Sequence, residues 1–420
     1  MFRQLSLDDI EEVFTPGAPI LRREFFVGRE RELDDLKAAI RRRGYHPIIT
    51  GDRGVGKTSL VRQAFSKSAA HAVFVGCNSE MTFDEFARNA LRELGGEVAA
   101  TEVAHESEAA LSGGGKILGI GAEASGKTKT TRKVRALGTE KIDPWRFYLE
   151  LRDLGQKGIV VLDEYDVVSA TNKPFHRAVA ELIKTLADHS HDCDTRIVIV
   201  GIGQSAQVLL GRHESIERSA TEIHLNPLTA TAVYAFLSSA EDELKVRFTP
   251  AVKDSLVETS SGYPYFVHLV GLECLAAMHR RDPNDRVVGE HDYKEAIDRA
   301  IRRAFRAELR KYSNAMRNLD ELSMSVVREI ASLGRRDRHV TEDELQKRVT
   351  FIMRVSASEV RTAFKQLHQS GLVYATSTNN YVRFRDPLLG PFIRAWMLPE
   401  LGPEPNVRQL QLFGESEGTA

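Results

Sequence analysis

The sequence predicts an α/β fold, in which a parallel β-sheet is covered by helices on both faces and followed by a helical lid and a small C-terminal unit. In the first half of the 420 residues, short apolar runs such as residues 158–162 alternate with amphipathic segments of helical period. Strands that are apolar throughout are typical of parallel sheets, because both of their faces are buried. From about Thr229 onward only helical spacing remains, until a hairpin pattern returns near the end.

Local features of the sequence justify the elements in order. Thr82 is a favourable N-cap for the helix that follows it, and Pro144 suits the first turn of another helix. The expected core elements are helix 26–40, strand 46–50, helix 59–65, strand 71–78, helix 82–94, helix 143–155, strand 158–166, helix 175–190, strand 195–203 and strand 221–228. The expected lid helices are 229–244, 249–260 and 263–281, and a long basic helix is expected at 293–311. We expect Trp145 and Trp396 to be core aromatics.

The C-terminal part predicts three helices, at 319–333, 341–349 and 357–370, followed by a two-stranded hairpin and a closing helix. This is the element order of a winged helix-turn-helix. The expected divisions are an N-terminal lead at 1–24, an α/β core at 25–226 with a mobile insertion at 101–141, a helical lid at 227–290, a basic linker helix at 291–318, the winged helix-turn-helix at 319–399 and a disordered tail at 400–420.

Two segments match the phosphate-loop pattern G-x-x-x-x-G-K-[ST], at residues 51–58 and 121–128. The pattern predicts a nucleotide site only where a strand precedes it and a helix follows it, because the loop amides and the helix N-terminus then hold the phosphates. The first match has both neighbours. The second lies in a stretch rich in Gly, Ser, Thr and Lys, so we expect that only the first binds nucleotide.

Nucleotide hydrolysis requires groups that hold phosphate, ligate Mg²⁺ and orient water. We expect the backbone of residues 52–57 and the Lys57 side chain to hold the phosphates, and Thr58 to ligate the metal. Asp163 and Glu164 end a buried strand, at the edge of the sheet where ligands bind in this class of fold. Asp163 is the second candidate metal ligand, and Glu164 is the candidate that polarises the attacking water.

Two further polar residues are candidates for stabilising the transition state. Gln204 follows the strand at 195–203 and is expected beside the γ-phosphate, with an ordinary loop amide as the alternative. Arg218 precedes the last strand of the sheet and is expected to reach the nucleotide of a neighbouring subunit, with an ordinary surface arginine as the alternative.

This arrangement resembles the AAA+ P-loop ATPases. Within them it is most similar to the branch of origin-recognition and replication-initiator proteins, their bacterial relatives and the archaeal-type or STAND ATPases. The resemblance rests on "FVGREREL", "GDRGVGKTS", "VVLDE", "VGIGQS" and "ERSATEIHL", and on the lid and winged helix, so it covers nearly the whole chain. It implies a P-loop NTPase sheet, ATP and Mg²⁺ as cofactors, and a homo-oligomer.

The resemblance also assigns nucleotide-binding residues. It implies that Val27, Gly28 and Arg29 flank the adenine, and that Gln204 takes the place where initiators carry an Asn. It implies that the phosphate loop binds through Gly51, Asp52, Arg53, Gly54, Val55, Gly56, Lys57, Thr58 and Ser59. The lid departs from the initiators, because "SGYPYFVHLVG" lacks their arginine and is more similar to the archaeal and STAND segment.

Basic residues beyond the lid are expected to contact double-stranded DNA through its phosphates. They are Arg299, Arg302, Arg303, Arg306, Arg310, Lys311, Arg335, Arg336, Arg338, Arg361, Lys365, Arg383 and Arg385. Glu342, Glu344 and Glu359 dilute this charge. Two functions therefore stay open. One is a DNA-associated ATPase that acts as a nucleotide-driven switch or assembly factor. The other is a signalling or defence ATPase scaffold whose winged helix contacts protein.

The tail contains "QLQLF", which resembles the peptide by which bacterial replication and repair proteins dock on the sliding clamp. Gln409, Leu410, Leu412 and Phe413 are the expected contacts. No stretch approaches the roughly 20 apolar residues of a membrane span, so no membrane partner is expected. Three widely spaced cysteines are typical of a reducing compartment, which predicts a cytoplasmic location.

Overall fold

The computed structural model describes residues 5–66, 71–95, 140–155, 158–203, 206, 209, 218–304, 316, 319–333, 340–375, 380–385 and 389–396. Several predictions of the sequence analysis lie outside these residues. They concern the second phosphate-loop match at 121–128, Gln204, the basic residues at 306, 310, 311, 335, 336 and 338, and the tail at 400–420.

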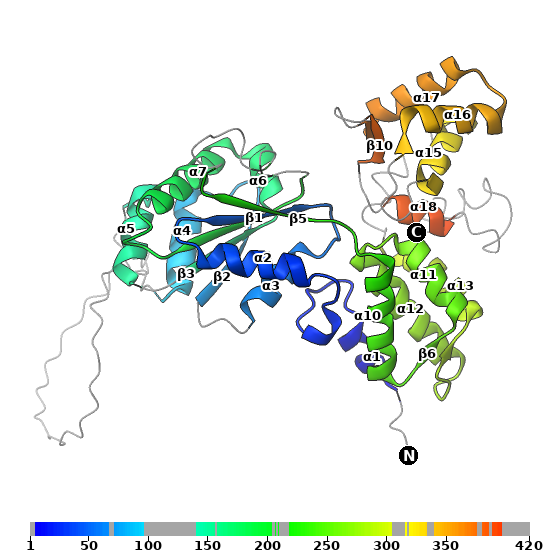
Figure 1. Cartoon of the computed structure of the whole chain (residues 1–420), viewed down its shortest axis with the longest axis horizontal. Helices are drawn as coiled ribbons and strands as arrows, with labels where there is room; N and C mark the ends of the chain where they lie inside the picture. Colours follow the sequence, from blue (N-terminus) through cyan, green and yellow to red (C-terminus); the bar gives the residue numbers. More distant parts are fainter. Residues whose placement is uncertain are drawn as a thin grey trace, which may run out of the picture.

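A five-stranded parallel sheet forms the core of the first half of the chain (Figure 1). Its strands are β1 (His46–Gly51), β2 (His71–Gly76), β3 (Gly158–Asp163), β4 (Arg196–Val200) and β5 (Ala220–Leu225). Their order is β2-β3-β4-β1-β5, so β1 lies between β4 and β5. All neighbouring strands are parallel, which places their carboxyl ends at one edge of the sheet.

Helices cover both faces of this sheet, as the sequence predicted. One face packs against α2 (Glu30–Arg41) and α3 (Lys57–Phe65). The other face packs against α4 (Phe83–Glu93), α5 (Pro144–Leu154), α6 (Tyr165–Thr171) and α7 (Lys173–Asp188). Successive strand residues point to opposite faces, so Ile48 belongs to the second core and Ile49 to the first.

Two predicted helix starts of the core are confirmed, whereas the helix predicted from residue 26 begins only at Glu30. Thr82 caps α4 in a reciprocal capping box with Glu85, and α5 begins at Pro144 after the N-cap Asp143. The prediction that Trp145 is a core aromatic is wrong, because its side chain is 49% exposed and packs against the rings of Tyr148 and His189 at the surface. It lies in the first turn of α5.

The lid consists of α10 (Ala230–Leu244), α11 (Pro250–Ser260), α12 (Pro264–Arg281) and α13 (Glu290–Ala304). It also contains a short parallel pair that the sequence analysis did not predict, β6 (Arg247–Phe248) with β7 (Val287–Val288). A further unpredicted helix, α1 (Leu7–Val13), packs against α12. None of the described helices is long and apolar enough to cross a membrane.

The C-terminal unit contains three helices, a small sheet and a closing helix. Its elements are α15 (Glu321–Leu333), β8 (Val340–Thr341), α16 (Glu342–Met353), α17 (Ala357–Gln369), β9 (Val373–Ala375), β10 (Tyr381–Phe384) and α18 (Leu389–Trp396). The sheet has three antiparallel strands in the order β8-β10-β9, whereas the sequence predicted two. Helix α18 lies between this unit and the lid (Figure 1).

Candidate nucleotide-binding site

The phosphate loop joins β1 to α3 at the carboxyl edge of the sheet. Gly51 has φ +140°, and a Cβ added there would lie 2.5 Å from the carbonyl oxygen of Leu225, so no larger residue has room. The loop ends at Gly56, which precedes the N-terminus of α3. Free backbone N–H groups and the positive end of a helix favour anions at this point.

Lys57 and Thr58 lie in the first turn of α3. The Lys57 ammonium donates to the carbonyls of Gly51 and Asp52, at 3.1 Å and 2.8 Å, so it folds back along the loop. Burial lowers the pKa of Lys57, and the carboxylates of Asp166, Asp52 and Asp163 oppose that shift. The neighbouring carboxylates thus favour the charged form of this partly desolvated ammonium, and the charged form is the one that attracts an anion.

The predicted metal ligands are brought together by the fold. The Thr58 hydroxyl donates to Oδ2 of Asp163 at 2.8 Å, although the two residues come from different strand–helix connections. A hydroxyl and a carboxylate are oxygen ligands of the kind that Mg²⁺ prefers, beside a loop suited to phosphate. This donor set therefore fits the ion that the sequence analysis expected.

Glu164 follows Asp163 and has a left-handed backbone with φ 58°, unusual for a residue with a side chain. Its N–H donates to Oδ1 of Asp163 at 2.9 Å, and its own carboxylate is exposed at the mouth of the site. Left-handed non-glycine residues concentrate at functional sites. The backbone thus turns Asp163 toward Thr58 and leaves Glu164 facing solvent.

Asp166 is a site residue that the sequence analysis missed. Its Oδ1 accepts from the N–H of Ile202 at 2.8 Å, which ties the start of α6 to the end of β4. Gly51 N–H donates to the Gly203 carbonyl at 3.0 Å, so the same segment is also held against the phosphate loop. These contacts place the chain leading to Gln204 beside the site, whereas Gln204 itself is not described. The third acid of "DEYD" was the only signal in the sequence that could have indicated this residue.

A narrow apolar pocket lies between the phosphate loop, the segment before α2 and the lid. It is lined by Ile20, Phe25, Phe26, Val27, Arg29, Val55, Gly56, Ser59, Leu228, Phe236, Pro264, Val267 and His268. Val27, which the resemblance placed beside the adenine, lines this pocket. Gly28 has φ +67°, and a Cβ there would lie 2.5 Å from the Ala232 Cβ, so it allows α10 to approach.

Two residues expected to bind nucleotide are engaged within the protein. The Arg29 guanidinium is 5% exposed and donates to the carbonyls of Val55, at 3.0 Å, and Asn226. The Ser59 hydroxyl accepts from the N–H of Ile20 at 3.1 Å. Both side chains brace the walls of the pocket with these bonds.

The lid contributes Tyr263, to which the sequence analysis assigned no role. Its hydroxyl donates to Oδ2 of Asp52 at 3.0 Å, and the N–H of Tyr265 donates to the carbonyl of Gly54 at 3.4 Å. The "GYPYF" segment thus lies directly on the phosphate loop. Only its resemblance to other lids could have indicated this contact, since it joins residues more than 200 positions apart.

Arg218 lies far from the phosphate loop of its own chain. It is exposed and precedes Ala220, which pairs with His46 at the start of β1, whereas the loop follows the end of β1. Six strand residues separate the two edges by about 17 Å. The fold therefore does not bring Arg218 into the site of the same chain.

The comparisons with known proteins agree with this geometry. Residues 26–200 match a family model described as an AAA ATPase domain. A search of curated protein sequences found no match.

Solved structures share the fold at low sequence identity. A Walker-type ATPase of Pyrococcus abyssi is 17% identical with a TM-score of 0.53, and the alignment covers 90% of this chain and 99% of that one. The ORC2 protein of Aeropyrum pernix, solved in complexes with ADPNP and ADP, is 13% identical with a TM-score of 0.50, covering 92% and 98%. Residues 26–200, which match the model of an AAA ATPase domain, contain four of the five strands of the parallel sheet and the phosphate loop of a P-loop NTPase fold.

Proposed function

We propose that the protein is a cytoplasmic ATPase that binds ATP with Mg²⁺ and hydrolyses it to ADP and phosphate. The observation that carries this proposal is the 2.8 Å hydrogen bond between Thr58 and Asp163, with Glu164 next in the chain. It joins the helix of the phosphate loop to the acidic end of β3. The AAA ATPase family match over these residues supports the same activity.

Each group of the site has a distinct task in this proposal. Lys57 and the N–H groups at the start of α3 bind the outer phosphates. Thr58 and Asp163 hold Mg²⁺, which neutralises phosphate charge when it is bound. The Glu164 carboxylate accepts a hydrogen bond from the attacking water and orients it. Val27 and the other residues of the apolar pocket exclude water from the adenine of the nucleotide.

Two variants separate binding from hydrolysis. We expect Lys57→Ala to abolish binding of a fluorescent ATP analogue, because the phosphates lose their cation. Glu164→Gln is expected to bind normally and to lower kcat by at least about 100-fold, as loss of a catalytic base does. Lys127→Ala, in the second phosphate-loop match, is the matched control and should behave as wild type. Equal damage by Lys57→Ala and Lys127→Ala would contradict the proposal.

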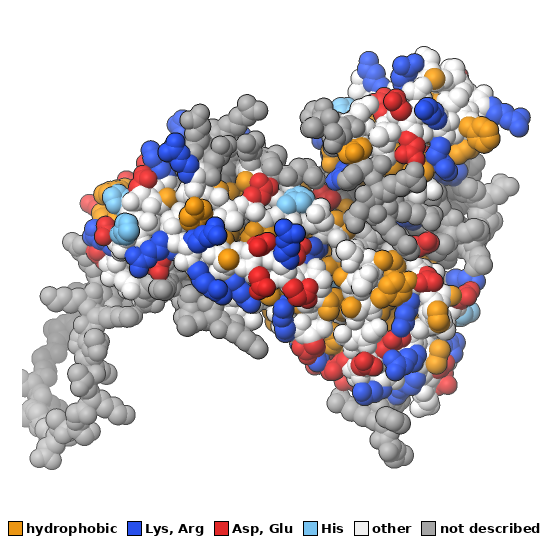
Figure 2. All heavy atoms as spheres, viewed as in Figure 1, with side chains coloured by type: hydrophobic (Ala, Val, Ile, Leu, Met, Phe, Trp, Pro, Cys, Tyr) orange, Lys and Arg blue, Asp and Glu red, His pale blue; other side chains and the backbone are white. Residues whose placement is uncertain are grey.

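We further propose that the C-terminal unit is a winged helix through which the ATPase associates with duplex DNA as a nucleotide-driven switch or assembly factor. In α17, Arg361 and Lys365 are exposed on one face, four residues apart. Figure 2 displays Lys and Arg side chains over the outer surface of this unit, with a few acids between them. Arg385 is also exposed, whereas Arg383 is only half-exposed.

Binding to a mixed-sequence duplex over a range of salt concentrations tests this association. Affinity should fall steeply with salt, and Arg361→Gln with Lys365→Gln should reduce the salt slope by about two, one for each lost phosphate contact. Lys347→Gln on α16 is a control for the loss of one exposed positive charge. Absence of salt-dependent binding by the wild-type chain would exclude this role.

One contact favours the second candidate, a signalling or defence scaffold whose winged helix contacts protein. Arg394 of α18 is 7% exposed and donates to Ser261 of the lid, so the C-terminal unit already engages another part of the chain. A chain that binds ATP but no DNA, and whose C-terminal unit is protected from protease until a partner is added, would favour this candidate.

We also propose the sliding clamp as a partner, through the tail residues Gln409, Leu410, Leu412 and Phe413. The support is the peptide sequence alone, with three apolar side chains between polar flanks. Micromolar binding of the full chain to purified bacterial clamp is expected, with loss in the Leu412→Ala, Phe413→Ala double variant. Absence of binding by the unmodified chain would discard this partner and leave the ATPase proposal intact.

A further inference from the structure

The turn that precedes α12 touches two separate parts of the molecule. On one side, Tyr263 donates to the Asp52 carboxylate at 3.0 Å, so the lid contacts the phosphate loop. On the other side, Arg394 donates to the Ser261 hydroxyl and to the carbonyl of Ala331 at 2.7 Å. Arg394 lies in α18 and Ala331 in α15. The turn is therefore fixed at both ends, by the nucleotide site and by the C-terminal unit.

The turn has little freedom to absorb a displacement. Gly262, between the two contact residues, has φ +78°, and a Cβ added there would lie 2.1 Å from the Leu228 carbonyl oxygen. That glycine's carbonyl accepts from the Leu228 N–H at 2.7 Å, and Ser261 is itself left-handed with φ 48°. A tightly packed turn passes movement at one end to the other, since close-packed interiors transmit strain.

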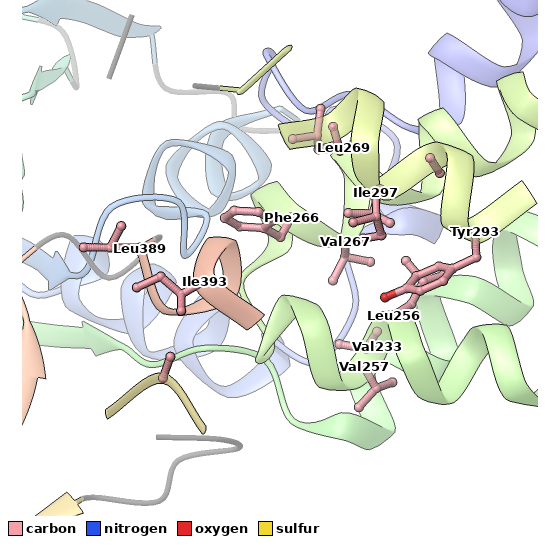
Figure 3. Packing of buried hydrophobic residues seen from close by; sticks show 14 of the residues in the cluster. Val233, Leu256, Val257, Phe266, Val267, Leu269, Tyr293, Ile297, Leu389 and Ile393 are labelled. Atoms are coloured by element: carbon pink, nitrogen blue, oxygen red, sulfur yellow. The ribbon is translucent and has the colours of Figure 1, made fainter. Parts of the chain in front are cut away.

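Apolar packing alone does not explain the buried arginine. Leu389 and Ile393 of α18 belong to the same core cluster as Phe266 of α12 (Figure 3). These side chains would hold α18 on the lid without a charge. A buried guanidinium has a large desolvation cost, which must be offset by directed hydrogen bonds. Its bonds to Ser261 and Ala331 therefore fix the position of the turn relative to α15 more narrowly than packing would.

The pKa shifts of two tyrosines agree with a short separation between the C-terminal unit and the phosphate loop. Burial raises the pKa of Tyr263, Asp52 raises it further, and Arg383 and Arg394 oppose the shift. Burial also raises the pKa of Tyr374 on β9, with a smaller contribution from Asp52. The small sheet of the C-terminal unit thus lies within electrostatic reach of the phosphate loop.

The hydrogen bond between Tyr263 and Asp52 bears on nucleotide binding because Asp52 places a negative charge on the phosphate loop. A carboxylate on a phosphate loop repels phosphate unless its charge is directed away or shared. Tyr263 shares it through the hydrogen bond and fixes the carboxylate on the lid side of the loop. A shift of the turn would release this carboxylate toward the phosphates and weaken their binding.

We propose that Arg394 is a positioning residue for the nucleotide site: through Ser261 and Tyr263 it fixes Asp52, and it makes nucleotide affinity depend on the placement of the C-terminal unit. This inference rests on the proposed ATP site. It assigns roles to three residues that do not touch the metal ligands or the attacking water.

The test is a double-mutant cycle on the full-length chain, read by the Kd of a fluorescent ADP or ATP analogue. Arg394→Met and Tyr263→Phe should each weaken binding by about tenfold, with kcat unchanged and KM raised. The double variant should be no weaker than the poorer single variant, because residues in one chain of contacts are not additive. Arg394→Lys, which can still donate to Ser261, should recover part of the affinity.

Two further variants keep the result interpretable. Arg348→Met removes an exposed arginine that pairs with Glu329 in the same unit, and it should leave nucleotide affinity unchanged. Ser261→Ala removes the acceptor of Arg394 and the long 3.4 Å hydrogen bond from the same hydroxyl to the Glu258 carbonyl. It tests the relay even if Arg394→Met does not fold, and it should weaken binding about as much as Tyr263→Phe. Failure of the wild type to bind nucleotide would refute the proposed function. Normal binding by wild type and by Ser261→Ala, or additive effects in the cycle, would overturn this inference alone.

Discussion

Two polar side chains, Arg29 and Ser59, help to shape the candidate nucleotide pocket. Arg29 ties the Val55 carbonyl to that of Asn226, and Ser59 anchors the segment at Ile20. Such buried polar groups are costly unless paired, so each contact constrains two elements at once. The pocket therefore depends on residues that would not touch the phosphates.

Gly28 allows the lid to approach the core. We expect Gly28→Ala to lower the free energy of unfolding by about 2–4 kcal/mol, through the left-handed backbone and the overlap with Ala232. Gly155→Ala is the matched control, since Gly155 has φ +60° but no heavy atom within 4 Å of the added Cβ. Gly155→Ala should lower the free energy of unfolding, measured in urea, by about 1 kcal/mol. Equal losses would show that the close approach to α10 has no cost.

His268 predicts a loss of stability in acid. Burial lowers its pKa from 6.5 to about 4, and its Nδ1 accepts from the Thr15 N–H at 3.0 Å. Between pH 6.5 and pH 4 this histidine is protonated in the unfolded chain but neutral in the folded one. The free energy of unfolding is therefore highest above about pH 6.5 and falls by about 3 kcal/mol toward pH 4. His268→Asn keeps the acceptor without titrating. Its unfolding free energy should fall less between pH 7 and pH 4, and parallel curves for the two chains would refute the assignment.

At the scale of elements, the sequence predicted the long elements and missed the shortest ones. The core strands were predicted because they are short runs of apolar residues, and the long helices because their apolar residues repeat at helical spacing over many positions. Strands β6, β7 and β8 have two residues each, too few for any repeat. Helix α1 has only seven residues and is held by contacts with α12.

A buried acid joins three short elements of the lid. Glu241 of α10 is 3% exposed and accepts from Lys253 of α11 and from the N–H of Phe248 in β6, both at 2.7 Å. Glu241→Ala should lower the free energy of unfolding in urea by about 3–5 kcal/mol, because the half-buried Lys253 ammonium and a buried backbone N–H lose their partner. Glu243→Ala is the control, since Glu243 pairs with Arg22 at the surface and should cost under about 1 kcal/mol. Similar losses in both variants would contradict this account.

At the scale of the whole molecule, the sheet separates Arg218 from the phosphate loop of its own chain. Arg218 precedes β5 at one edge, and the loop follows β1 at the other. If it acts on a nucleotide, that nucleotide belongs to a second copy of the chain, as the sequence analysis expected. An ordinary surface arginine, the alternative in the sequence analysis, fits the same geometry.

An oligomer of this kind gives concentration-dependent activity. ATPase turnover per chain should rise with protein concentration, and a mixture of Arg218→Ala with Glu164→Gln chains should regain part of the activity that each lacks. The mixture works because some sites combine an intact Glu164 with a neighbour's intact Arg218. Arg31→Ala on the exposed face of α2 is the control, because Arg31 lies outside the phosphate loop and its loss should leave turnover unchanged. Turnover that is flat with concentration would refute action between chains.

The sequence by itself determined the α/β class, the phosphate loop at residues 51–58 and the acids Asp163 and Glu164. Each follows from local spacing, since a strand, a glycine-rich turn and a helix are adjacent in the chain. Only the tertiary structure decided that Thr58 meets Asp163, that Tyr263 meets Asp52 and that Arg394 meets Ser261. These pairs lie 105, 211 and 133 positions apart. No local pattern encodes such contacts, because they exist only once the sheet order and the packing of lid and C-terminal unit have fixed which side chains face one another.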